Sequence, residues 1–201
     1  MVERQLERRG ITDRRVLEAM GRVPRHEFVP GASVDQAYSD QPLPIGHGVT
    51  ISQPYIVALM TQALELRGDE RVLEVGTGSG YAAAVLAELA ASVVSVETIG
   101  PLAELARSRL ATYGDRVLVV EGDGSLGYPD AAPYDAISVT AAAPRVPQPL
   151  LDQLAIGGRL VMPVGRGIED LVLVRRDETG FTRTVLTSVR FVPLIGEHGA
   201  S

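Results

Sequence analysis

Residues 72–81 read Val72-Leu73-Glu74-Val75-Gly76-Thr77-Gly78-Ser79-Gly80-Tyr81, and a run of small residues, Ala82-Ala83-Ala84-Val85-Leu86-Ala87, follows. A short apolar run, alternate glycines and then helix formers predict a strand, a tight turn and a helix. Glycine is needed where the backbone takes a positive φ or where a ligand approaches the main chain closely. The first turn of a helix also offers free N–H groups to polar ligand atoms. We therefore expect a ligand-binding turn at the end of this strand.

Acidic residues also follow the next two expected strands. Glu97 comes about 20 residues after Gly76, the spacing at which nucleotide-binding βαβ units place a carboxylate on the ribose hydroxyls. Asp123, between Gly122 and Gly124, can reach an adenine amino group while the backbone stays close to the ring. The alternatives are a solvated acid for Glu97 and an Asx turn without a ligand for Asp123. Together these residues predict an adenosine-type cofactor.

Glu74 indicates which adenosine-type cofactor to expect. It lies two residues before Gly76, at the expected strand tip. A carboxylate there can accept hydrogen bonds from bound water or from an ammonium group, whereas it would repel a pyrophosphate. This favours the zwitterionic sulfonium S-adenosylmethionine over NAD. A purely structural turn and an NAD-linked oxidoreductase are the alternatives.

Composition limits the class of protein. The chain has 201 residues, 45% of them hydrophobic and 22% charged, as expected of one globular domain. It has no cysteine, and 19 basic residues stand against 25 acidic ones, which argues against disulfides, thiolate metal sites and nucleic-acid binding. No apolar run approaches the ~18 residues of a membrane span. We expect a cytoplasmic protein with no metal, no nucleic-acid partner and no membrane association.

Strands and helices alternate along the middle of the chain. We expect strands at 71–75, 92–97, 116–121, 134–140 and 159–165, with helices at 79–90, 99–113 and 147–155. This order predicts an α/β fold with a doubly wound, mostly parallel Rossmann-like sheet. The segments 171–174 and 182–194, around a turn at Thr179-Gly180, read as added antiparallel strands.

The N-terminal third is expected to form a helical and loop subdomain. Residues 2–21 read as a helix broken at Gly10 and capped at Thr12, and the segment 50–55 opens a further helix that runs to about Leu66. Residues 23–48 are rich in Pro and Gly and show no regular pattern, so we expect a loop, with a lid at 42–48. The expected domain is 1–201, divided into 1–66, the cofactor-binding core 67–165 and the C-terminal strands 166–201.

Several segments together resemble the protein-L-isoaspartate O-methyltransferase family almost from end to end. The matching segments are Val23-Pro24-Arg25-His26-Glu27-Phe28-Val29-Pro30, Ala37-Tyr38-Ser39-Asp40, Pro42-Leu43-Pro44-Ile45-Gly46, Thr50-Ile51-Ser52-Gln53-Pro54-Tyr55, 73–81, Gly122-Asp123-Gly124, Pro133-Tyr134-Asp135-Ala136-Ile137, Thr140-Ala141-Ala142-Ala143 and Phe191-Val192-Pro193-Leu194. The glycine turn is common to many methyltransferases, whereas the segments at 50–54 and 140–143 are far more specific.

The resemblance implies methyl transfer from S-adenosylmethionine to the α-carboxylate of L-isoaspartyl residues in damaged proteins and peptides, which starts repair through a succinimide. It implies that Ser52 is the catalytic residue, although its place before Gln53-Pro54 also suits an N-cap. The implied cofactor residues are Glu74, Gly76, Thr77, Gly78, Ser79, Gly80, Glu97, Thr98, Asp123 and Gly124. The implied substrate residues are Thr50, Thr140, Ala141 and Val192.

One residue departs from the family pattern. The family usually has Gln before Thr50, and this chain has Val49. The alternatives are therefore a related methyltransferase that acts on Asp of a dedicated peptide precursor or on a small carboxylic acid, and a catalytically silent module that binds the cofactor.

Overall fold

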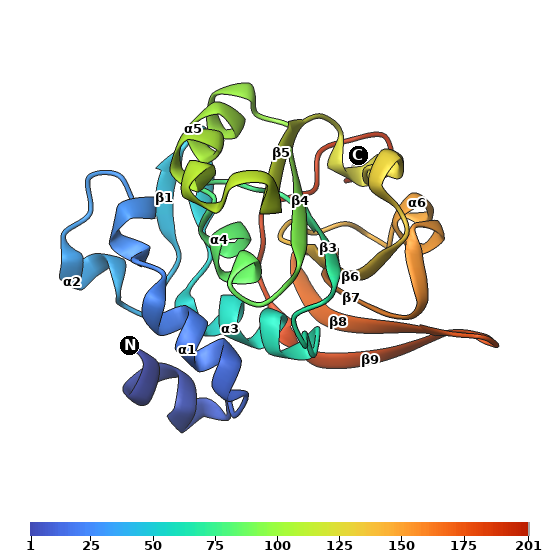
Figure 1. The fold of residues 1–201 in the computed structure, drawn as a ribbon, viewed down its shortest axis with the longest axis horizontal. Helices are drawn as coiled ribbons and strands as arrows, with labels where there is room; N and C mark the ends of the chain where they lie inside the picture. Colours follow the sequence, from blue (N-terminus) through green and yellow to red (C-terminus); the bar gives the residue numbers. More distant parts are fainter. Residues whose placement is uncertain (201) are drawn as a thin grey trace.

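The computed structural model describes residues 1–200 and is built on a seven-stranded sheet of order β5-β4-β3-β6-β7-β8-β9 (Figure 1). The strands are β3 (Arg71–Val75), β4 (Ser92–Glu97), β5 (Val117–Glu121), β6 (Tyr134–Val139), β7 (Leu154–Arg166), β8 (Ile168–Asp177) and β9 (Gly180–Val189). Strands β3 to β7 are parallel, and β8 and β9 join antiparallel. This confirms the doubly wound fold. The chain order reverses between β3 and β6, where ligands of open α/β sheets bind.

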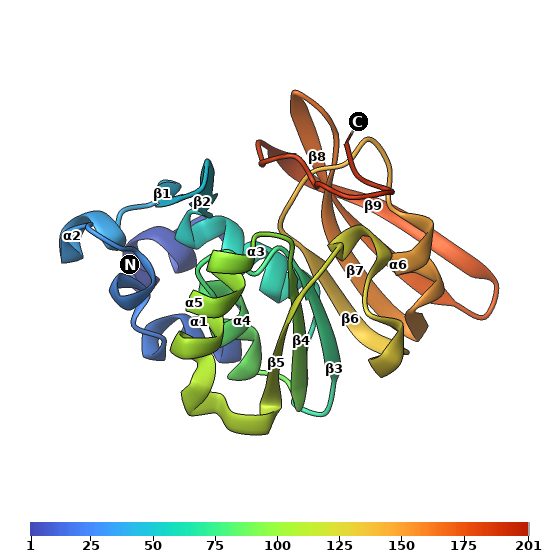
Figure 2. The same ribbon diagram turned by 90° about the horizontal axis from the view of Figure 1, so that it is seen from above.

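Helices cover both faces of the sheet. The helices α4 (Tyr81–Ala87) and α5 (Gly100–Leu110) lie on one face, and α6 (Gln148–Asp152) lies on the other (Figure 2). Successive strand side chains point to opposite faces. Val72 of β3 accordingly packs in the apolar cluster with α4 and α5, whereas Leu73 packs in the cluster with α6. Burial on both faces explains the Val-rich strands.

The N-terminal subdomain packs beside α4. Its helices are the turns Val2–Leu6 and Glu7–Arg9, then α1 (Arg14–Arg22) and α3 (Pro54–Ala63). The predicted break at Gly10 is confirmed, since its φ is 92°. The predicted cap at Thr12 is wrong by one residue. Asp13 caps α1 because its carboxylate accepts from the backbone N–H of Arg15 at 2.9 Å.

The segment 23–48 is more regular than predicted. It contains a 3-10 helix at Arg25–Phe28, α2 (Val34–Ala37) and β1 (Leu43–Gly46), and β1 forms a hairpin with β2 (Val49–Ile51). These elements are too short for a periodic sequence signal. Local hydrogen bonds form them, such as the reciprocal pair between Ser33 and Gln36 that caps α2.

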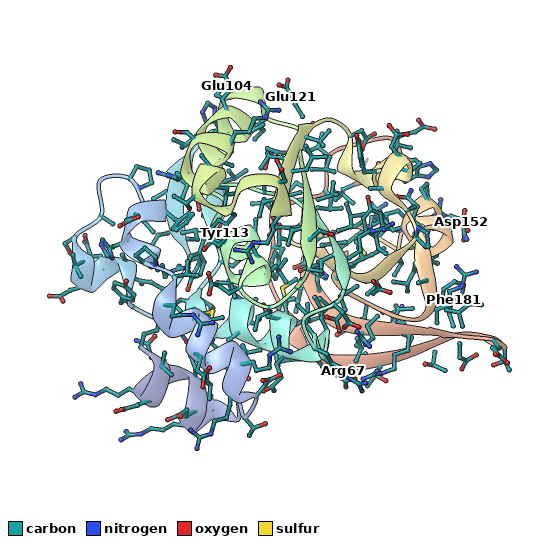
Figure 3. The ribbon with its side chains drawn as sticks, viewed as in Figure 1. Arg67, Glu104, Tyr113, Glu121, Asp152 and Phe181 are labelled. Atoms are coloured by element: carbon teal, nitrogen blue, oxygen red, sulfur yellow. The ribbon has the colours of Figure 1, made fainter. Side chains whose placement is uncertain are left out.

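The C-terminal part differs from the prediction in one respect. The strand expected to reach residue 194 ends at Val189, and the following residues leave the sheet to pair with Ala142 instead. The β8–β9 hairpin extends beyond the rest of the sheet, with Phe181 exposed near its far end (Figures 1 and 3). Within residues 1–200, every helix is too short or too polar to cross a membrane.

Candidate active site

Two cavities meet at the edge of the sheet formed by the carboxyl ends of β3, β4 and β6. The first, which we call the inner pocket, is bordered by Gly76, Gly78, Glu97, Thr98 and Gly124, among others. The second, the outer groove, has a volume of about 620 Å³ and contains Ser52. Thr50, Thr140 and Val192 border both cavities. The structure thus brings residues of six separate segments to one edge of the sheet.

The glycine turn after β3 is held against the loop after β6. Gly76, Gly78 and Gly80 all have positive φ, at 93°, 54° and 91°. A Cβ on Gly76 would lie 2.4 Å from the hydroxyl oxygen of Thr140, and that hydroxyl donates to the Gly76 carbonyl at 2.7 Å. Only glycine allows this approach, so the turn's main chain forms one wall of the pocket.

Glu97 joins the end of β4 to the glycine turn. Its Oε2 accepts from the Gly78 N–H at 2.7 Å, and its Oε1 accepts from the Ile99 N–H at 3.0 Å. Each carboxylate oxygen can accept a second hydrogen bond. Because Glu97 borders the inner pocket, the remaining lone pairs are available for a pair of hydroxyl donors.

Glu74 lies behind the glycine turn, out of contact with solvent. Its side chain is fully buried, and the Ser95 hydroxyl, which also bonds that of Thr77, donates to its Oε2 at 2.5 Å. Burial raises the pKa of Glu74 to about 8. Desolvation thus favours the protonated form of this group, whereas the sequence predicts an ionised carboxylate that repels a pyrophosphate. A contact between Glu74 and the cofactor stays a prediction. Glu74 supports the glycine turn through Ser95 and Thr77, and its other oxygen, Oε1, has no partner within residues 1–200.

Asp123 forms an Asx turn, which was one of the two roles that the sequence suggested for it. Its Oδ1 accepts from the Ser125 N–H at 2.8 Å, and its Oδ2 accepts from the Glu197 N–H at 2.8 Å. The neighbouring Gly124 borders the inner pocket. A contact between Asp123 and an adenine ring stays a prediction.

Ser52 is not a helix cap. The N-cap of α3 is Gln53, and no side chain caps this helix. The capping alternative for Ser52 is therefore wrong, because the extended Gln53 lies between Ser52 and Pro54, the first residue of the helix. Ser52 instead borders the outer groove, and Ala141, predicted on the substrate side, borders the inner pocket.

Sequence reasoning missed Arg25, which lies directly behind Ser52. Its side chain is fully buried, with Nη2 donating to the Ser52 carbonyl at 2.8 Å and Nε to the Ala37 carbonyl at 2.7 Å. The guanidinium carbon is also 4.8 Å from the centre of the Tyr81 ring. Burial lowers the pKa of Arg25. These carbonyls are 12 and 27 residues away in the chain, so no local pattern could have indicated them.

We expect Arg25→Met to lower the free energy of unfolding by about 2 kcal/mol or more, because two buried carbonyls lose their donors. Urea unfolding measures this change. Arg14→Met, at an exposed position of α1, is the control and should stay within about 0.5 kcal/mol of the wild type. Equal stability of the two variants would contradict the role of Arg25.

Glu74 should make stability depend on pH. Between the ordinary pKa of 4.5 and the folded pKa of about 8, the folded protein keeps a proton that the unfolded chain has released. The wild type should therefore lose stability relative to Glu74→Gln as pH rises from 5 to 8, by up to about 1.4 kcal/mol per pH unit. Denaturant unfolding of both proteins at four pH values checks this, and parallel curves would exclude it.

Comparisons with known proteins agree with this geometry. Residues 1–199 match the family described as protein-L-isoaspartate(D-aspartate) O-methyltransferase (PCMT). The chain is 61% identical over 201 residues to protein-L-isoaspartate O-methyltransferase 1 of Syntrophobacter fumaroxidans, covering 99% of this chain and 94% of the relative. It is also 61% identical over 203 residues to the Methanoculleus marisnigri protein-L-isoaspartate O-methyltransferase, covering 99% and 91%.

Solved structures show the same similarity in three dimensions. A protein-L-isoaspartate O-methyltransferase superposes with a TM-score of 0.88 at 30% identity, covering 99% of this chain and 67% of that one. A putative protein-L-isoaspartate O-methyltransferase from Plasmodium falciparum, in complex with S-adenosyl-L-homocysteine, gives 0.81 at 27% identity and covers 94% of each chain. Because the match extends over nearly the whole chain in both sequence and fold, this chain belongs to the protein-L-isoaspartate(D-aspartate) O-methyltransferase family.

Proposed function

We propose that the protein transfers a methyl group from S-adenosylmethionine to the α-carboxylate of L-isoaspartyl residues in damaged proteins. The ester then closes to a succinimide, which reopens in part to normal aspartate. The observation that carries this proposal is the wall shared by the two cavities. Thr50, Thr140 and Val192 border both the inner pocket and the outer groove, so a cofactor in the pocket and a peptide in the groove would meet there.

The residues that border the inner pocket suit the methyl donor. The turn Gly76-Thr77-Gly78-Ser79-Gly80 has positive φ at its three glycines, which leaves main chain beside the ligand. Glu97 and Thr98 would hold the ribose, and Gly124 would lie against the adenine, with Asp123 beside it. Glu74 would hold the turn in place without touching the cofactor. When bound, the cofactor supplies a methyl group that its sulfonium already activates.

The outer groove offers hydroxyl groups where the substrate carboxylate would lie. An α-carboxylate is an anion at neutral pH, so no general base is needed to make the nucleophile. Ser52 and Thr50 would donate hydrogen bonds that align the carboxylate oxygen with the methyl carbon and sulfur. Thr140, whose hydroxyl donates to the Gly76 carbonyl, would form the wall beside them. Alignment of this kind accelerates a reaction by orders of magnitude. Ser52 therefore acts by orientation and forms no covalent intermediate.

Val49 lies on the cofactor side of the wall. It is half-buried at the start of β2 and borders the inner pocket, while Thr50 next to it borders the groove as well. A change from the family's usual Gln to Val thus alters the pocket rather than the groove. The substitution therefore gives no reason to prefer a dedicated peptide precursor over damaged proteins as the substrate.

Labelled S-adenosylmethionine and a synthetic peptide that contains L-isoaspartate test the function, with the L-aspartate form of the same peptide beside it. We expect methyl transfer to the isoaspartyl form alone, followed by release of methanol. Transfer to the aspartyl form would indicate a dedicated peptide-modifying enzyme instead.

Ser52→Ala should lower methyl transfer about 10²-fold through misalignment of the substrate, with the affinity for S-adenosylhomocysteine unchanged. Thr184→Ala, which removes an exposed hydroxyl on β9, is the control and should leave the rate unchanged. If Ser52→Ala lost cofactor affinity and stability to the same degree as activity, its role would be structural.

The hairpin β1–β2 should act as a lid over the glycine turn. A Cβ on Gly78 would lie 3.2 Å from the tip of the Ile45 side chain, and the inner pocket holds about 80 Å³, below the ~300 Å³ of a ligand pocket. We therefore expect a wall to move when the cofactor binds. We expect added S-adenosylhomocysteine to increase hydrogen-exchange protection in residues 42–48, with β8 as the unchanged control. Unchanged protection in 42–48 would exclude a lid.

A further inference from the structure

Two arginines, Arg9 and Arg190, border the outer groove. No acidic side chain of residues 1–200 borders it, although the chain as a whole has a net charge of −6. The remaining side chains of the groove are hydroxyl, amide and apolar groups, among them Tyr55, Ile168 and Phe191. The groove is therefore a locally positive region on an acidic protein.

Arg9 already has an acidic partner within the protein. Its guanidinium forms an ion pair with Asp40, and its guanidinium carbon lies 3.5 Å from the centre of the Tyr55 ring. Asp40 also accepts from the Tyr55 N–H at 2.9 Å and from the side-chain amide of Gln53 at 3.3 Å. Arg9 is thus held in place as a part of the groove, with its charge balanced by Asp40.

Arg190 differs from Arg9 because its charge is not balanced. It is exposed, and within residues 1–200 no ion pair joins it to an acidic side chain. Two acids near the start of β8, Glu169 and Asp170, pair with the last two residues of β9. Glu169 is buried and accepts from the Phe191 N–H at 3.1 Å, so it is occupied by the main chain. A guanidinium stays charged at neutral pH, and Arg190 therefore offers a cation to whatever lies in the groove.

Arg190 also lies close in the chain to the wall at which the substrate would react. It precedes Val192 by two residues, and Val192 borders both cavities, whereas Arg190 borders the groove alone. Two residues of chain span at most about 7 Å, which is also the length of two residues of an extended peptide. A peptide whose isoaspartyl carboxylate reached the wall would thus have a neighbouring side chain within reach of the guanidinium.

We propose that Arg190 is a specificity-determining residue, which selects isoaspartyl sites that have an acidic side chain within two residues of the damaged position. The inference rests on the proposed function, in which the peptide occupies the outer groove. A flanking carboxylate would form a charge-assisted hydrogen bond with Arg190. Because this contact is remote from the reacting atoms, it stabilises the bound substrate and the transition state equally, so it lowers KM and leaves kcat unchanged.

Matched isoaspartyl peptides test this selection. They carry either two Glu or two Gln residues, placed directly before or directly after the isoaspartyl residue. On at least one side, we expect the wild type to have a KM roughly two- to fivefold lower for the Glu peptide at equal kcat, as exposed ion pairs imply. Raising the salt from 0.1 to 1 M should remove the difference, because the Debye length falls from about 10 to about 3 Å. Equal KM values within both pairs would overturn the proposal.

Variants assign the preference to Arg190. Arg190→Gln should give the same KM for the Glu and the Gln peptides, and Arg190→Glu should favour peptides that carry Lys at those positions. Arg183→Gln is the matched control, since it removes the same charge from an exposed position of β9 outside the groove, and it should keep the preference for Glu.

Two results with these variants would contradict the assignment. If Arg190→Gln weakened the Glu and Gln peptides by the same factor, Arg190 would bind the isoaspartyl carboxylate itself instead of a flanking one. If Arg183→Gln lost the preference as fully as Arg190→Gln, net charge rather than Arg190 would be its cause. Either result would overturn the proposal.

The same assays distinguish failure of this inference from failure of the proposed function. If the wild type methylates every isoaspartyl peptide with one KM, only the selection by Arg190 is wrong. If it methylates none of them, the proposed function is wrong, and the selection by Arg190 falls with it.

Discussion

The approach of Gly76 to Thr140 is the contact on which the rest of the site depends. It joins the turn after β3 to the loop after β6, at the point where the chain order of the sheet reverses. Because Thr140 borders both cavities, the same contact sets the distance between the inner pocket and the outer groove. A methyl donor and a carboxylate react only when they are aligned, so this spacing matters more than the acidity of any group in the site.

Buried ionisable groups support each cavity from behind. Glu74 reaches the glycine turn through Ser95 and Thr77, and Arg25 holds the main chain at Ser52. Burying such groups is unfavourable unless they are hydrogen-bonded. Each still has one atom without a partner within residues 1–200, Glu74 Oε1 and Arg25 Nη1. Burying these two groups thus lowers the stability of the fold, while their other hydrogen bonds fix the backbone around the site.

The C-terminal segment after β9 borders both cavities and so connects them. It borders the groove at Phe191 and contributes Val192 to the shared wall, and its Glu197 N–H donates to Asp123. The strand β9 that precedes it is at the edge of the sheet, where the chain is free to leave the ladder and cross over the carboxyl ends of the parallel strands. The antiparallel strands β8 and β9 therefore lead directly into the segment that forms a wall of the site.

The sequence by itself determined the alternation of strands and helices, the glycine turn and the acid at the end of β4, because hydrophobic period and turn chemistry are local properties. It also placed Ser52, Thr140 and Val192 at one site through their resemblance to family segments. Only the tertiary structure decided that Glu74 is buried with a raised pKa and that Gln53 rather than Ser52 occupies the N-cap position of α3. It also decided that Arg25 reaches the Ser52 carbonyl and that Glu197 reaches Asp123. Desolvation and hydrogen bonds between distant segments control those outcomes, and neither can be read from neighbouring residues in the chain.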